Sequence, residues 1–138
     1  MQMKISETAL VDMVTSFLLE GGGKVFAEVA SLGQSADLVY LCGTEVTFVE
    51  VKVNAISRAI GQCRAHELVA DYICIATATK SISANNLDTI KELGYGLISC
   101  QVGGRCTWIV RPKKLAKYWG PIRTQVVERI LVGVRDGT

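Results

Sequence analysis

The chain has 138 residues and a mass of 14.9 kDa, which fits one domain spanning residues 1–138. Hydrophobic residues make up 49% and charged residues 20%, and this balance excludes an intrinsically disordered chain. The net charge of +2 is unevenly distributed, because residues 1–56 carry a net charge of −4 and residues 111–138 a net charge of +5. An acidic half joined to a basic end suits a cation-binding site beside an anion-binding surface, and equally an ordinary soluble protein.

Cysteine usage and the N-terminus predict the compartment. The chain has five cysteines, with no C-x-x-C pair and no metal-ligand spacing. Their odd number and their apolar surroundings predict buried free thiols in a reducing cytosol. The N-terminus lacks a signal-peptide pattern, and no apolar run approaches the roughly 18 residues of a membrane helix. We therefore expect a cytoplasmic protein that does not enter a membrane.

Hydrophobic spacing predicts one helix and three strands in the first part of the chain. Ser6 is an N-cap candidate before apolar residues spaced three and four apart, and the glycines at 21–23 end this helix. Three β-rich runs follow, over residues 24–30, 37–42 and 46–53.

The rest of the chain is predicted to alternate helices and strands, in the total order α-β-β-β-α-β-α-β-β-α. Gly103-Gly104 is a hairpin-turn signal between the last two strands. Pro121 fits the first turn of a C-terminal helix. The predicted elements are a helix capped by Ser57 and running to residue 70, a strand over 72–78, a helix over 85–93, strands over 95–101 and 106–111, and the helix after Pro121.

The most informative stretch is a predicted hairpin that contains two acids and a lysine. A two-residue turn at Gly43-Thr44 would place Asp37 directly across from Glu50, with their Cβ atoms about 5 Å apart. Strand side chains alternate, so Glu50 and Lys52 share one face. The valines at positions 49, 51 and 53 occupy the other face, a pattern typical of a central strand.

Two carboxylates opposite each other require compensation, because like charges in a cross-strand pair are destabilising. Lys52 offsets part of this repulsion, and a divalent cation with oxygen ligands would offset the rest. The alternative is an exposed hairpin with solvated charges and a surface ion pair worth about 0–1 kcal/mol.

Ala36-Asp37 followed by Glu50-Val51-Lys52 resembles the motif of the PD-(D/E)xK nuclease superfamily, with alanine in place of the usual proline. This superfamily includes archaeal Holliday-junction resolvases and many repair and restriction nucleases. The resemblance implies an α/β fold with a restriction-endonuclease-like αβββαβ core, in which helices flank a mixed central sheet, here followed by a C-terminal helix. It also implies that Asp37, Glu50 and the Val51 carbonyl hold Mg²⁺, with Mn²⁺ as a substitute, and that Lys52 positions the attacking water.

Looser matches to the family add four residues. Glu7 fits an acidic position in the first helix, where it would help to hold a second ion or its waters. Gln62 and His66 stand where some members carry Gln-x-x-x-Tyr, and their spacing predicts one helical face with Arg58 one turn earlier. Gln62 is a catalytic candidate, while Arg58 and His66 are candidates for DNA contact. Glu28 either faces this site from the first predicted strand or is an exposed strand residue, and the sequence leaves both alternatives open.

The function implied by the resemblance is Mg²⁺-dependent hydrolysis of phosphodiester bonds in duplex or branched DNA, in repair or recombination. The alternative is a catalytically inactive protein of the same fold that binds nucleic acid or a protein partner. The apolar stripe of the predicted C-terminal helix would cover the core or form a homodimer, and the sequence leaves both open. The basic candidates for phosphate contact, with solvated surface as the alternative, are Lys113, Lys114, Lys117 and Arg123.

Overall fold

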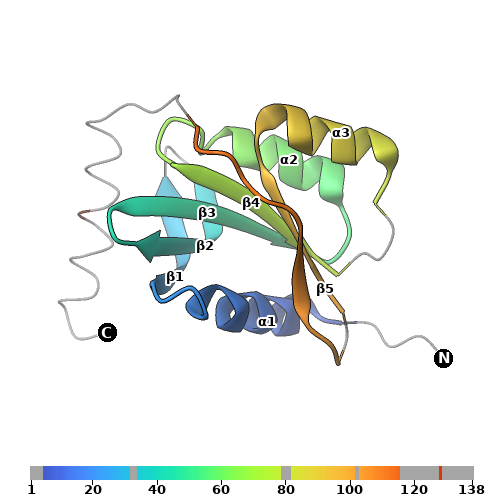
Figure 1. Cartoon of the computed structure of the whole chain (residues 1–138), viewed down its shortest axis with the longest axis horizontal. Helices are drawn as coiled ribbons and strands as arrows, with labels where there is room; N and C mark the ends of the chain where they lie inside the picture. Colours follow the sequence, from blue (N-terminus) through green and yellow to red (C-terminus); the bar gives the residue numbers. More distant parts are fainter. Residues whose placement is uncertain (1–4, 32–33, 79–81, 102, 116–127, 129–138) are drawn as a thin grey trace.

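The computed structural model describes residues 5–31, 34–78, 82–101, 103–115 and 128. Within these residues six strands form one mixed sheet in the order β1-β2-β3-β4-β5-β6. The β3-β4 and β4-β5 pairs are parallel, and the other neighbours are antiparallel. Helix α1 covers one face of the sheet, and α2 and α3 lie on the other (Figure 1). The elements are α1 (Glu7–Leu19), β1 (Lys24–Ser31), β2 (Gln34–Cys42), β3 (Glu45–Lys52), α2 (Ile56–Arg64), β4 (Tyr72–Thr77), α3 (Ala84–Leu93), β5 (Gly96–Cys100) and β6 (Cys106–Val110).

The predicted order of elements is confirmed from α1 to β6. Apart from Glu128, the predicted helix after Pro121 lies outside the described residues. No helix in the described part of the chain is long and apolar enough to cross a membrane.

Helix α1 begins and ends where the sequence predicts, while α3 ends before Gly94 as predicted but begins one residue earlier than predicted. The Ser6 hydroxyl accepts a hydrogen bond from the backbone N–H of Ala9 at 3.1 Å, which caps α1. Ser83 caps α3 in the same way, and Gly94 ends that helix with φ of 78°. The buried face of α1 consists of Leu10, Val14 and Leu18.

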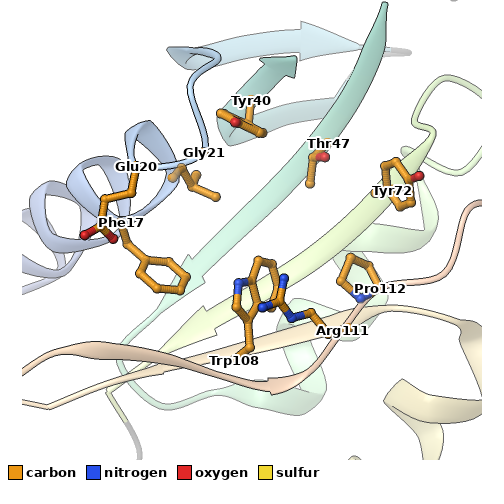
Figure 2. A pocket seen from close by; sticks show the side chains of 10 residues that line it. Phe17, Glu20, Gly21, Tyr40, Thr47, Tyr72, Trp108, Arg111 and Pro112 are labelled. Carbon is orange, nitrogen blue, oxygen red and sulfur yellow. The ribbon is translucent and has the colours of Figure 1, made fainter. Parts of the chain in front are cut away.

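Glycines after α1 allow β2 to approach the end of the helix closely. A Cβ atom on Gly21 would overlap the Tyr40 hydroxyl, and a Cβ on Gly23 would overlap the Leu41 carbonyl oxygen. The Tyr40 hydroxyl accepts a hydrogen bond from the Gly23 N–H at 3.1 Å. Tyr40 is thereby held at the margin of the sheet face that α1 leaves open (Figure 2).

The register of the β2-β3 hairpin agrees with the prediction. Its pairs run from Cys42 opposite Glu45 to Leu38 opposite Val49. β3 is a central strand, antiparallel to β2 and parallel to β4. Its Phe48 packs in the core beside α2, while Val49 packs in the core beside α1.

The predicted start and end of α2 are wrong. The helix begins after Ala55, and Ser57 lies inside it, where its hydroxyl contacts Asn86 Oδ1 at 3.2 Å instead of capping the backbone. The helix ends at Arg64 rather than at residue 70, and turns follow it. The tertiary structure explains the early end, because Asp71 binds the start of β3: its N–H donates to the Val46 carbonyl at 2.9 Å, and its carboxylate accepts from the Val46 N–H at 2.8 Å.

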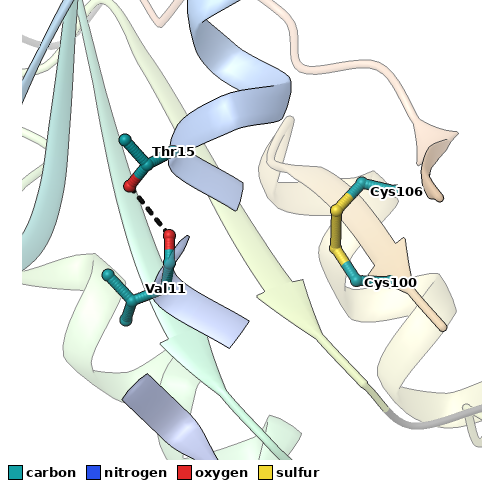
Figure 3. Close-up of a disulfide and its surroundings, with 4 residues drawn as sticks. All are labelled: Val11, Thr15, Cys100 and Cys106. Carbon is teal, nitrogen blue, oxygen red and sulfur yellow. Dashed lines mark hydrogen bonds between the residues drawn. A yellow bond between two sulfur atoms is a disulfide. The ribbon is translucent and has the colours of Figure 1, made fainter. Parts of the chain in front are cut away.

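The expectation that all five cysteines are free is also wrong. Cys100 and Cys106 are opposite each other in the β5-β6 register, with their Cα atoms 4.0 Å apart, and they form a disulfide (Figure 3). The antiparallel hairpin brings these two residues together although no sequence motif marks them. Cys42 is free and exposed, whereas Cys63 and Cys74 are free and buried, as expected. The compartment stays a prediction.

Candidate functional site

Asp37 and Glu50 come together just beyond the last paired residues of β2 and β3. The paired residues of the hairpin end at Leu38–Val49, one position before Asp37 and Glu50, and alternation from Phe48 places the Glu50 side chain on the α2 face of the sheet. Asp37 Oδ2 accepts a hydrogen bond from the Val51 N–H at 2.8 Å. Burial raises the pKa of Glu50, the hydrogen bond from His66 lowers it, and the nearby Asp37 carboxylate raises it further. The predicted convergence of the two carboxylates is therefore present.

The backbone of Val51 faces the same gap between the strands. In a strand, the N–H and the C=O of one residue point toward the same neighbour. Because the Val51 N–H donates to Asp37, its carbonyl oxygen also faces the β2 side. Two carboxylates and one carbonyl thus border one region at the end of β3.

His66 is the buried partner of Glu50. Its Nε2 lies 3.2 Å from Glu50 Oε1, and only 1% of the His66 surface and 3% of the Glu50 surface is exposed. The His66 ring also packs against Phe48, with ring centroids 4.9 Å apart. A side chain this deeply buried does not reach a nucleic acid on the surface, so the expected DNA contact by His66 is wrong, and its contact with Glu50 replaces it.

Lys52 and Glu7 form an ion pair at the edge of the site. Lys52 Nζ lies 3.8 Å from Glu7 Oε1, with 24% of the lysine side chain and 54% of the glutamate side chain exposed. This contact joins the end of β3 to the first turn of α1. The structure therefore brings Glu7 to the lysine of the predicted motif.

The expected common face of Arg58, Gln62 and His66 is not formed. Because α2 ends at Arg64, His66 lies beyond the helix and is buried, while Arg58 is exposed. Gln62 is half-buried, and its Oε1 is a buried atom with no hydrogen-bond partner among the described residues. His66 Nδ1 is likewise a buried atom with no hydrogen-bond partner in the described part of the chain.

Glu28 is the register neighbour of Asp37 on β1. The pairs on either side of it are Ala27–Leu38 and Val29–Ala36, and Glu28 itself is exposed with φ of 53°. Despite this position, the described ranges contain no group of three or more His, Cys, Asp or Glu side chains placed to hold a metal ion. The oxygen donors at the site are thus two side chains and one main-chain carbonyl.

Of the predicted basic residues, Lys113 and Lys114 do not join this site. Lys114 Nζ lies 3.1 Å from Glu45 Oε2, at the opposite end of β3 from Lys52. Seven residues of a strand separate the two ends by roughly 23 Å. Lys113 is exposed beside Lys114, and its N–H donates to the Gly94 carbonyl at 2.9 Å. Lys117 and Arg123 lie outside the described residues.

Sequence patterns missed two features: the partner of Glu50, and a pocket of about 520 Å³ on the other sheet face. The burial of His66 depends on the turns after α2, and the pocket residues form no recognisable motif. The strand register could have indicated the pocket, because the hairpin pairs Tyr40 with Thr47 and the β3-β4 register pairs Thr47 with Tyr72. These pairings place two tyrosines on one sheet face with a short side chain between them.

Comparison with known proteins shows a likeness in fold. No family model matches the chain. None of the curated proteins matches it. A solved structure, the crystal structure of a protein of unknown function, AF1548, is similar with a TM-score of 0.53 and 19% identity over 63% of this chain. The similar region covers 54% of that protein, so the chain matches about half of its length, and the likeness concerns the fold alone.

Proposed function

We propose that this chain is a Mg²⁺-dependent DNA endonuclease with the restriction-endonuclease-like core of the PD-(D/E)xK superfamily. The observation that carries the proposal is the meeting of Asp37 and Glu50, thirteen positions apart, just beyond the last paired residues of β2 and β3. The element order α-β-β-β-α-β and the central place of β3 support the same proposal.

The donor set fits a hard cation. Asp37, Glu50 and the Val51 carbonyl supply oxygen ligands, which Mg²⁺ and Mn²⁺ prefer. A cation beside Asp37 and Glu50 would also relieve the repulsion that raises the Glu50 pKa. When bound, such an ion supplies Lewis-acid polarisation of a phosphate and a lowered pKa for water.

We assign Lys52 the role of orienting the attacking water. It follows Glu50 by two residues, so both side chains start on one face of β3. Glu7 holds the ammonium at the edge of the site. An ammonium near the nucleophile stabilises the negative charge that develops on water as it attacks.

Cleavage of DNA by the full chain tests this function. Supercoiled plasmid and a four-way branched DNA are incubated with the protein in Mg²⁺, in Mn²⁺ and in EDTA. The wild type is expected to nick or cut in either metal and to be inactive in EDTA. Asp37→Asn, Glu50→Gln and Lys52→Met should each lower the rate at least about a hundredfold. Glu92→Gln is the matched control, because Glu92 is exposed on α3 away from these residues.

The alternative is a protein of this fold that binds nucleic acid without cutting it. The burial of Glu50 against His66 favours it, because that contact occupies one of the carboxylate oxygens. In that case DNA binding survives EDTA, falls steeply with salt, and no cleavage occurs with any metal. Cleavage that persists in both Asp37→Asn and Lys52→Met would show that a different site is responsible.

A further inference from the structure

The pocket on the α1 face of the sheet is built from aromatic side chains of four different elements. It has a volume of about 520 Å³. Phe17 comes from α1, Tyr40 from β2, Tyr72 from β4 and Trp108 from β6 (Figure 2). All four are half-buried, so the pocket is open to solvent. Glu50 of the proposed nuclease site starts from the other sheet face, so this is a separate site.

The floor of the pocket contains a slot between two tyrosines. Tyr40 pairs with Thr47, and Thr47 pairs with Tyr72, so the three residues form one row across β2, β3 and β4. Neighbouring strands are about 4.8 Å apart, which separates the tyrosine backbones by about 9.6 Å. The short Thr47 side chain between them leaves this space open.

Both tyrosines are held in place before any ligand binds. The Tyr40 hydroxyl accepts from the Gly23 N–H at 3.1 Å, and the Tyr72 hydroxyl donates to Glu45 Oε2 at 3.2 Å. Glu45 is held in turn by Lys114. A fixed slot lowers the entropic cost of ordering side chains around a ligand.

The charges of the pocket favour a ligand that carries negative charge. The Arg111 guanidinium lies over the Trp108 ring, 5.0 Å from its centroid, and Phe17 contacts the same ring at 5.8 Å. Arg111 already occupies the indole face and would repel a cationic ligand. The Glu20 side chain turns away from the centre of the pocket (Figure 2). The exposed guanidinium is left to bind an anionic group such as a phosphate.

We propose that this pocket binds an unpaired nucleotide of a single strand, with the base between Tyr40 and Tyr72 and the phosphate on Arg111. Aromatic rings with an adjacent cationic side chain are the means by which proteins bind unpaired bases without reading sequence. The open form of the pocket lets a strand continue on both sides of the bound base. This site is independent of the nuclease proposal, because it requires no metal.

Titration calorimetry in EDTA tests the site with metal chemistry excluded. The probes are dAMP, deoxyribose 5-phosphate, choline, a ten-residue oligothymidylate and a blunt duplex. The wild type should bind the oligothymidylate, and dAMP should compete with it, while deoxyribose 5-phosphate binds far more weakly. Tighter binding of choline or of the duplex than of the oligothymidylate would overturn the proposal. A protein that binds dAMP but does not bind the oligothymidylate would overturn it as well.

Variants locate the binding in this pocket. Thr47→Phe fills the slot and should weaken binding of both dAMP and the oligonucleotide about tenfold or more. Thr107→Phe is the matched control, since Thr107 is exposed on β6 beside Trp108 and does not line the pocket. Arg111→Gln should weaken binding of dAMP but not of deoxyadenosine, whereas the charge control Lys91→Gln on α3 should change neither.

The Arg111→Gln variant also tests the proposal if Thr47→Phe does not fold. Arg111 is exposed, so Arg111→Gln is expected to keep the fold, as judged by circular dichroism and the urea midpoint. Equal binding of dAMP by Arg111→Gln and the wild type would overturn the assignment of the phosphate to this residue. Wild-type affinity in Thr47→Phe would overturn the assignment of the base to the slot.

Discussion

Glu50 and His66 form a buried pair, with Oε1 and Nε2 3.2 Å apart and almost no exposed surface on either side chain. The pair joins the central strand β3 to the turns after α2. A cation that binds Glu50 must share this carboxylate with His66. The pair therefore connects the stability of the fold to the chemistry proposed for the site.

Replacement of Glu50 by glutamine should change how stability depends on pH. The pKa of Glu50 is raised above its ordinary value of 4.5, chiefly by burial. Between the ordinary and the raised value, the native state keeps a proton that the unfolded state releases, so stability falls as pH rises through this window. Glu50→Gln removes this titration, and its stability relative to the wild type should increase with pH.

Urea unfolding in EDTA between pH 4.5 and 7 measures this difference. Glu67→Gln provides a control, because Glu67 is a half-buried acid whose carboxylate accepts a hydrogen bond from Tyr95, whereas His66 pairs with Glu50. A constant difference between Glu50→Gln and the wild type, or one that decreases with pH, would contradict the prediction.

Local patterns predicted the hairpin and its carboxylates. A two-residue turn fixes the register, and alternation fixes the face, so Asp37 and Glu50 could be placed together from the sequence. The same reasoning applies to β5 and β6, where the register also pairs Cys100 with Cys106. The number and spacing of the cysteines do not indicate this disulfide, because it depends on the register of the hairpin.

Contacts made after α2 could not be read from the sequence. The chain over residues 57–70 has the composition of a continuing helix, but Asp71 ties it to the start of β3. The resulting turns bury His66 against Glu50 instead of leaving it on the helical face with Arg58. Tertiary hydrogen bonds thus override helix propensity at this point.

Two glycine substitutions should have opposite effects on stability. Gly61 lies inside α2, and a Cβ there would meet no atom within 4 Å, so Gly61→Ala should raise the free energy of unfolding by about 0.5–1 kcal/mol. Gly23→Ala should lower it by at least about 1–3 kcal/mol, because its Cβ would overlap the Leu41 carbonyl and the Tyr40 ring. Urea denaturation of both variants measures the sign of each change in the free energy of unfolding. Changes of the same sign in the two variants would contradict the described packing.

The three free cysteines should differ in reactivity. Burial raises the pKa of the Cys74 thiol to about 12 and also raises that of Cys63, whereas Cys42 is exposed. Because the thiolate is the nucleophile, native protein at pH 8 should incorporate one iodoacetamide group rapidly, at Cys42. Mass spectrometry should show one label in native protein and three in urea. Cys42→Ser should show none in the native state, and rapid labelling of Cys74 would contradict its burial.

Raised thiol pKa values also predict a loss of stability in alkali. Above the ordinary thiol value of 9.0, the unfolded state releases the Cys63 and Cys74 protons while the native state keeps them. Stability should therefore fall as pH rises above about 9. The double variant Cys63→Ala/Cys74→Ala should show a shallower fall between pH 8.5 and 10.5 in urea titrations at each pH.

Reduction of the Cys100–Cys106 disulfide should destabilise the protein without changing the register of β5 and β6. The bond closes a short loop with a sequence separation of six, and loop-closure entropy assigns such a bond about 2 kcal/mol. Backbone pairing between the strands remains when the sulfurs are separated. The urea midpoint should therefore fall by about 1–2 M in reductant, and Cys100→Ser/Cys106→Ser should match the reduced wild type. Cys42→Ser should retain the full response to reductant, since Cys42 is a free thiol. If reduction of both sulfurs, verified by mass, leaves the midpoint unchanged, the disulfide does not constrain the unfolded chain as proposed.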